Sequence, residues 1–182
     1  YGIKTKYRIL GTNYGKHKDT FLAEHEEIVV ATDAFTYEDF LEIRNLNFMF
    51  FTVFHLNFQK WFFQFVRHQG ISLAEYFSLF MKPDRNLNWP DGYLRFLDDF
   101  KSAIEEELFD TRAEVVAKVK EIFAANGNNV GEPTRINMNF GARLSYIESK
   151  WVKSVLIRHL DEIMEGDRSN EDRNLANSLI NL

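Results

Sequence analysis

The sequence predicts a mostly α protein, a helical bundle with a small N-terminal β-hairpin element. Helix-capping patterns, in which an acidic residue lies three positions after a hydroxyl residue, begin at Thr36, Ser72 and Thr111. Apolar residues recur at helical spacing through most of the chain after residue 36, whereas β-branched runs dominate residues 1–32. With 18 Phe and only 3 Pro in 182 residues, the core should be aromatic.

The β element is predicted within the first 32 residues. Thr5–Leu10 has the composition of a strand, residues 11–15 are rich in turn formers, and Glu27–Thr32 is an apolar run typical of a buried strand. We therefore expect a hairpin or two neighbouring strands, with a turn at Gly11–Gly15.

The first helices should begin at about Tyr37 and end at Gly70. A single helix from Tyr37 to Arg67 would be about 46 Å long at roughly 1.5 Å per residue, so we expect a break near Asn45 or Asn47. The uncharged stretch Phe48–Phe54 should be buried on all sides. After it, polar residues at helical spacing predict one exposed face: Asn57, Lys60, Gln64 and Arg67.

The rest of the chain is also predicted to be mainly helical. A short helix from Ser72 must stop by Lys82, since Pro83 cannot continue it, and a Pro- and Asn-rich loop follows. This loop would divide the chain into residues 1–82 and 83–182, unless the whole chain is one domain. Beyond it we expect helices over 94–108, 112–125, 144–166 and 170–182, and a strand over 136–140.

Composition excludes several classes of function. The chain has no Cys, so it can form no disulfide, thiolate nucleophile or Cys-held iron-sulfur cluster. A net charge of −5 argues against a nucleic-acid partner, and no apolar run is long enough to cross a membrane. We expect a cytoplasmic location. The first residue is Tyr1, without an initiator Met, so we expect a fragment of a larger protein.

The usual motifs of catalysis and metal binding do not occur in the sequence. The five His lie outside any HExxH pattern, no glycine run matches a phosphate-binding loop, and no GxSxG elbow is present. We expect His55 to be a core residue and the His159–Glu162 pair to be a surface contact. No catalytic, cofactor-binding or metal-ligating residue is therefore predicted.

Two sets of residues are candidates for binding. Lys4, Lys6 and Arg8 alternate along the first strand, so their side chains should emerge on one face, as an anion contact or interdomain contact or simply as a solvated face. An aromatic groove could form near Trp61 and Phe65, or near Trp89 and Tyr93.

Three segments, Gly2–Arg8, Glu26–Thr32 and Thr36–Phe40, together resemble the region that follows the barrel in cobalamin-binding-type radical SAM proteins. That family has a Gly-Ile/Met-Lys-Thr-x-x-Arg element, an acidic-then-apolar strand and a Thr- or Ser-led helix in this order. The likeness covers residues 1 to about 70. Residues 71–182 resemble no family.

The resemblance implies a parent radical SAM iron-sulfur enzyme, which would hold a 4Fe-4S cluster through CxxxCxxC, use S-adenosylmethionine and bind cobalamin through DxHxxG. Neither motif is in this chain, so no ligand is transferred to it. The chain would be a C-terminal accessory domain that shapes or closes the substrate site and contacts the upstream domains of its parent chain. An exposed apolar surface could also form a dimer.

Two alternatives remain open at this stage. The chain could be a free-standing helical protein or ligand-binding module that uses one of the aromatic grooves. It could also be a small enzyme that pairs Glu or Asp with His, which requires carboxylates and imidazoles close together.

Overall fold

The computed structural model describes residues 1–130, 135–164 and 169–180. The fold is mostly α with a small N-terminal β element, as predicted. The chain forms two compact units: unit 1 comprises Tyr1–Phe40 and Lys101–Ile136, and unit 2 comprises Leu41–Phe100 and Asn137–Leu182. This division differs from the predicted one at residues 82/83. The chain passes between the units three times: within helices α1 (Tyr37–Phe50) and α4 (Asp91–Glu106), and between Ile136 and Asn137.

Unit 1 contains a long antiparallel hairpin of β1 (Lys4–His17) and β2 (Thr20–Ala31). The predicted turn at Gly11–Gly15 is wrong, because β1 continues through it and the chain reverses at Lys18 and Asp19. The pairing register instead shifts between Ile9 and Tyr14. Gly11 has a φ of 56°, a conformation that glycine adopts without strain, so it accommodates an irregularity inside the strand.

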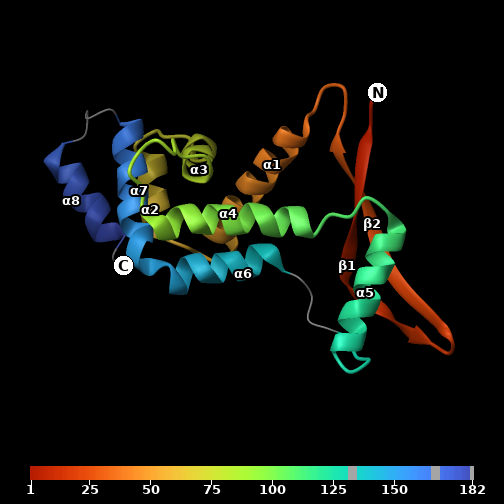
Figure 1. Ribbon diagram of the computed structural model, residues 1–182. Helices are drawn as coiled ribbons and strands as arrows, with labels where there is room; N and C mark the ends of the chain where they lie inside the picture. The colour runs from red at the N-terminus through yellow and green to blue at the C-terminus, as the bar shows by residue number, and fades with distance from the viewer. Residues whose placement is uncertain (131–134, 165–168, 181–182) are drawn as a thin grey trace. The chain divides into compact units, whose positions relative to one another are not determined.

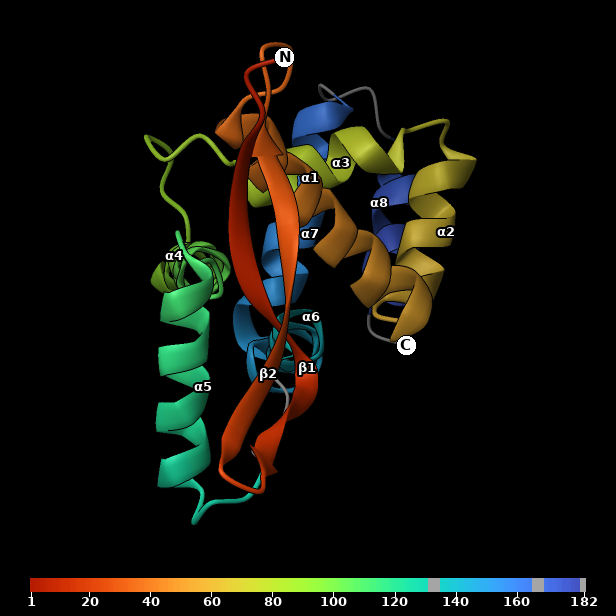
Figure 2. The same ribbon diagram turned by 90° about the vertical axis from the view of Figure 1, so that its right-hand side faces the viewer.

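Helix α5 (Arg112–Ala125) lies along the hairpin, as Figures 1 and 2 show from two sides. Thr111 and Glu114 form the predicted capping box, in which each side chain accepts a hydrogen bond from the other residue's backbone. The apolar face of α5 packs Val115 and Val119 against Tyr14 of β1 to make the core of unit 1.

Unit 2 is helical around an aromatic core. Phe48, Phe63, Phe77 and Phe100 are all almost fully buried, which confirms the expectation of an aromatic interior. Besides parts of α1 and α4, the unit comprises α2 (Lys60–His68), α3 (Leu73–Met81), α6 (Ile136–Ala142), α7 (Ser149–Ile163), α8 (Asn170–Leu179), and the π-helical segments η1 (Phe51–His55) and η2 (Arg143–Ile147).

The predicted break near Asn45 or Asn47 lies about ten residues further on. Helix α1 runs through both asparagines into η1, and the chain turns at Asn57 and Gln59, whose φ angles are 55° and 47°. Asparagine tolerates a left-handed conformation, so it can mark the end of a helix, but this segment contains several asparagines and the sequence does not show which one does so.

The stretch Phe48–Phe54 is not buried on all sides. Phe48, Met49 and Thr52 are fully buried, whereas Phe54 is about half exposed at 55%. The absence of charge predicted burial, but it does not distinguish a buried face from an exposed apolar one. The polar face of the following segment is confirmed, since Lys60, Gln64 and Arg67 are exposed.

Two predictions near the C-terminus were also wrong. Residues 136–140 form the start of α6, a helix, where a strand was expected. The helix expected over 144–166 is divided into η2 and α7, and α7 ends at Ile163. The last helix begins at Asn170 as predicted. Gly166 and residues 181–182 lie outside the described residues.

No helix in the described part of the chain has the length and apolar character needed to span a membrane.

Candidate functional site

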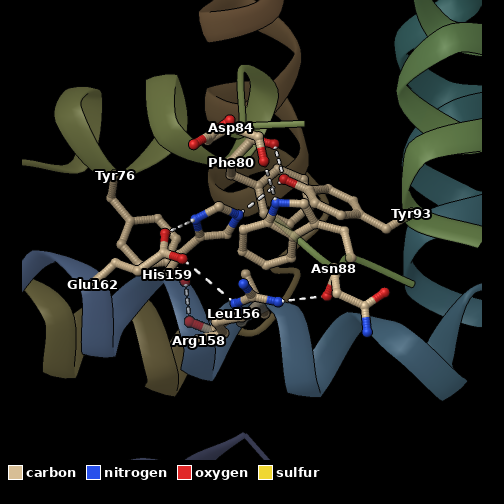
Figure 3. Close-up of polar contacts among 10 residues, drawn as sticks. Tyr76, Phe80, Asp84, Asn88, Tyr93, Leu156, Arg158, His159 and Glu162 are labelled. Atoms are coloured by element: carbon tan, nitrogen blue, oxygen red, sulfur yellow. Dashed lines mark hydrogen bonds and ion pairs between the residues drawn. The ribbon is translucent and has the colours of Figure 1, made fainter. Parts of the chain in front are cut away.

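The most polar region of the unit 2 core surrounds His159 of α7 (Figure 3). Trp89 stacks on the imidazole with ring centroids 4.6 Å apart, and the Arg158 guanidinium lies 3.8 Å from the centre of the Trp89 ring. Trp89 also donates a hydrogen bond from its indole N–H to the Asp84 carbonyl at 2.9 Å. Rings from three parts of the chain therefore enclose one histidine.

Hydrogen bonds connect His159 to both sides of the cluster. The Tyr93 hydroxyl donates to the Phe80 carbonyl and lies 2.9 Å from His159 Nε2. On the other side, Nδ1 lies 3.2 Å from a carboxylate oxygen of Glu162. These three contacts need three protons, and a neutral Tyr and a neutral His supply only two. The network is therefore one proton short when both are neutral.

Burial sets the protonation state of this network. It lowers the pKa of His159 to about 4, and the positive charge of Arg158 acts in the same direction. Burial also raises the pKa of the Tyr93 hydroxyl far above its usual range. At neutral pH the imidazole is therefore neutral, despite the nearby Glu162 carboxylate. Because Tyr93 donates to Phe80, the single imidazole proton can serve only one of two contacts, Nε2 with the Tyr93 hydroxyl or Nδ1 with Glu162.

This cluster corrects one prediction. The His159–Glu162 pair was expected at the surface, but His159 is fully buried. Trp89 and Tyr93, predicted to lie near an aromatic groove, have ring centroids 5.4 Å apart, and both are buried. His159 and Glu162 satisfy the spacing for acid-base chemistry, but a sealed imidazole cannot reach a substrate. The cluster stabilises the packing of α4 and α7 within unit 2.

The other predicted groove, near Trp61 and Phe65, has one residue at the surface and one in the interior. Trp61 is 52% exposed and has the Lys60 ammonium 5.3 Å from its ring centre, whereas Phe65 is buried. His55 was expected in the core but is exposed and stacks on Phe51. The Phe-rich sequence around His55 predicted an internal position, but η1 turns this side to the solvent.

Lys6 and Arg8 meet acidic residues of their own unit. The Lys6 ammonium lies 2.6 Å from Asp110, and this hydrogen bond raises the pKa of Lys6. Arg8 pairs with Glu26 across the hairpin and lies 3.8 Å from Glu107. Lys4 is exposed and has no ion-pair partner among the described residues. Lys6 and Arg8 are therefore paired with carboxylates of unit 1, whereas a contact of Lys4 with an anion or another domain stays a prediction.

Unit 1 contains a cavity of about 250 Å³ that no sequence pattern revealed. Its apolar wall includes Ile9, Tyr14, Phe109 and Ile122, and its charged lining consists of Arg8, Glu106, Glu107 and Lys118. Gly11 also lines it, at the irregular point of β1. Sequence analysis proposed only Arg8 of these residues for binding, because the cavity depends on how α5 and the end of α4 pack on the hairpin.

The residues of this chain do not fit the metal groups that the resemblance implies for the parent enzyme. The sequence has no Cys to hold a 4Fe-4S cluster and no DxHxxG segment for cobalamin. Within the ranges that the structure describes, no three His, Asp or Glu side chains come together in a group suited to a metal ion.

Comparison of the chain with protein-family models, with curated proteins and with solved structures finds no match.

Proposed function

We propose that this chain is a C-terminal accessory region of a cytoplasmic radical SAM enzyme and that it shapes or closes the substrate site. The observation that carries the proposal is the order of the elements in unit 1. The three segments of the resemblance are the start of β1, the end of β2 and the capped start of α1. Thr36 and Asp39 cap that helix through reciprocal hydrogen bonds of 2.7 and 3.1 Å.

An exposed apolar surface at the open end of the hairpin supports a neighbouring domain as the partner. Ile3 is 61% exposed and Val29 is 47% exposed, and the paired strands bring the start of β1 next to the end of β2. Exposed apolar side chains at the end of a hairpin can mark a contact with another chain or domain. The upstream domains of the parent chain are the partner we propose, with a second copy of this chain as the alternative.

The sequence of the natural gene upstream of Tyr1 tests this proposal. We expect a CxxxCxxC motif a few hundred residues earlier, and a four-iron cluster in the full-length protein purified without oxygen. Substituting Ile3→Lys and Val29→Lys in the full-length protein should slow substrate turnover while cluster content stays normal. Leu175→Lys, an exposed apolar position of unit 2, is the matched control. A start codon immediately before the Tyr1 codon would contradict the proposal.

A ligand-binding module is the second candidate, and the cavity of unit 1 favours it. Unlike the predicted aromatic grooves, the cavity combines an apolar wall with charged residues at its rim, as small-molecule sites usually do. This function requires no preceding domain, so it stands if the gene begins at Tyr1.

A further inference from the structure

The charges around the unit 1 cavity do not balance. Arg8 is matched by two carboxylates, Glu26 and Glu107. Lys118 pairs with Glu121 at 3.1 Å. Glu106 is different, since it lines the cavity and has no cationic partner among the described residues. The unmatched charge at this cavity is therefore negative.

The end of helix α4 adds to this negative potential. Ala103 and Glu106 line the cavity from the last turn of α4, where the helix dipole has its negative end. A positively charged group is favoured at such a position, particularly beside a carboxylate. An anionic ligand would meet both the dipole and two glutamates, Glu106 and Glu107, and would have to displace one of them from Arg8.

The apolar part of the cavity is also suited to an organic cation. Tyr14 and Phe109 contribute aromatic rings to the lining, and Ile9 and Ile122 contribute aliphatic surface. Aromatic and aliphatic side chains together form an apolar wall for the hydrocarbon part of such a ligand. A volume of about 250 Å³ lies just below the usual range for ligand pockets, so the ligand must be small.

We propose that the unit 1 cavity binds a small organic ammonium compound, with its apolar body against Tyr14 and Phe109 and its charge at Glu106. The inference holds whether or not the chain belongs to a radical SAM enzyme. It also gives Glu106 a role, whereas an acidic run at residues 105–107 would otherwise serve only solubility.

Three probes of similar shape test the charge preference: 2-phenylethylamine, 2-phenylethanol and 3-phenylpropionate. Each is titrated into the full chain at low salt, with binding followed by calorimetry and by backbone amide NMR shifts. We expect the amine to bind about fivefold more tightly than the alcohol, which is the scale of a partly exposed ion pair, and the acid to bind most weakly. The shifted amides should belong to residues that line the cavity.

Two variants and one control separate charge from shape. Glu106→Gln should weaken binding of the amine about fivefold and leave the alcohol unchanged. Ala103→Leu should occupy part of the cavity and weaken binding of both probes. Glu105→Gln is the control, because Glu105 is on the same helix but pairs with Lys101 and does not line the cavity.

The proposal is overturned if the amine causes no saturable shift at the cavity or if the three probes bind equally well. Equal losses in Glu106→Gln and Glu105→Gln would also overturn it, because a general surface potential would then explain the preference. Glu106 is exposed and has no ion-pair partner in the described residues, so its substitution should not impair folding.

Discussion

The two units treat their polar groups in opposite ways. In unit 2, His159 is fully buried among aromatic rings and stays neutral, one proton short of a complete network. In unit 1, Arg8, Glu106 and Glu107 line an open cavity. A buried network that cannot change its partners stabilises the fold, whereas partly exposed charged groups beside an apolar wall can exchange one partner for another. The ligand site that we propose is therefore the cavity of unit 1.

The largest effect should come from removing the ring that covers His159. Trp89→Ala should lower the free energy of unfolding by about 3–5 kcal/mol, because a nearly fully buried Trp leaves a cavity. Trp61→Ala is the control, and it should cost at most about 1 kcal/mol since Trp61 is half exposed. Urea unfolding measures both. Equal losses would mean that Trp89 is not part of a sealed core.

The stability of unit 2 should depend on pH through His159. Its pKa is about 4 in the folded state and 6.5 in the unfolded chain, so the unfolded state binds more protons between these values. The free energy of unfolding should be constant above about pH 6.5 on this account, and should fall by about 3 kcal/mol as the pH drops to about 4. Urea unfolding at several pH values measures the slope.

The matched pair His159→Gln and His55→Gln isolates this contribution. Removing His159 should flatten the slope over this range, whereas removing the exposed His55 should leave it as in the parent protein. The same slope in both variants would assign the pH dependence to other groups.

A smaller effect is expected from the hydroxyl of Tyr93. Tyr93→Phe keeps the ring but leaves the Phe80 carbonyl and His159 Nε2 without their partner. Buried groups left unsatisfied should cost about 2 kcal/mol. Tyr146→Phe, at a position 83% exposed, should change stability by only a few tenths of a kcal/mol. A Tyr93→Phe variant as stable as the parent would show that water or another group satisfies the network.

The smallest effect should come from the ion pairs of unit 1. Lys6→Met removes the contact with Asp110, but the Asp110 side chain is 74% exposed, so the loss should be below about 1 kcal/mol and should shrink in high salt. Lys4→Met is the control without an ion pair. A loss as large as that of Tyr93→Phe would contradict the contrast between the units.

Local signals predicted much of the fold. The caps at Thr36, Ser72 and Thr111 were identified correctly because a hydroxyl that accepts from a backbone N–H three residues later is a short-range arrangement. Residues 136–140 were misassigned because five residues fit either period. The turn at Gly11 was wrong because glycine permits a strand irregularity as readily as a reversal.

The candidate sites were less predictable because they depend on contacts between distant segments. His159 and Tyr93 are 66 residues apart, and nothing in their neighbourhoods distinguishes a sealed histidine from a surface one. Sequence analysis gave Glu106 no role. Its position at the cavity follows from the packing of α4 and α5 on the hairpin, and the periodicity of apolar residues in the sequence does not reveal this packing.

Thiol reactivity tests the contrast between the units most directly, because the chain has no Cys of its own. Ala103→Cys places a thiol at the unit 1 cavity, and Ala176→Cys places one at a fully buried position of unit 2. Aminoethyl methanethiosulfonate should modify the thiol at position 103 faster than its anionic sulfonatoethyl analogue, after correction for their rates with the unfolded chain. The thiol at position 176 should react only after unfolding. Equal protection of both thiols, or faster reaction of the anionic reagent at position 103, would contradict an open, cation-selective cavity.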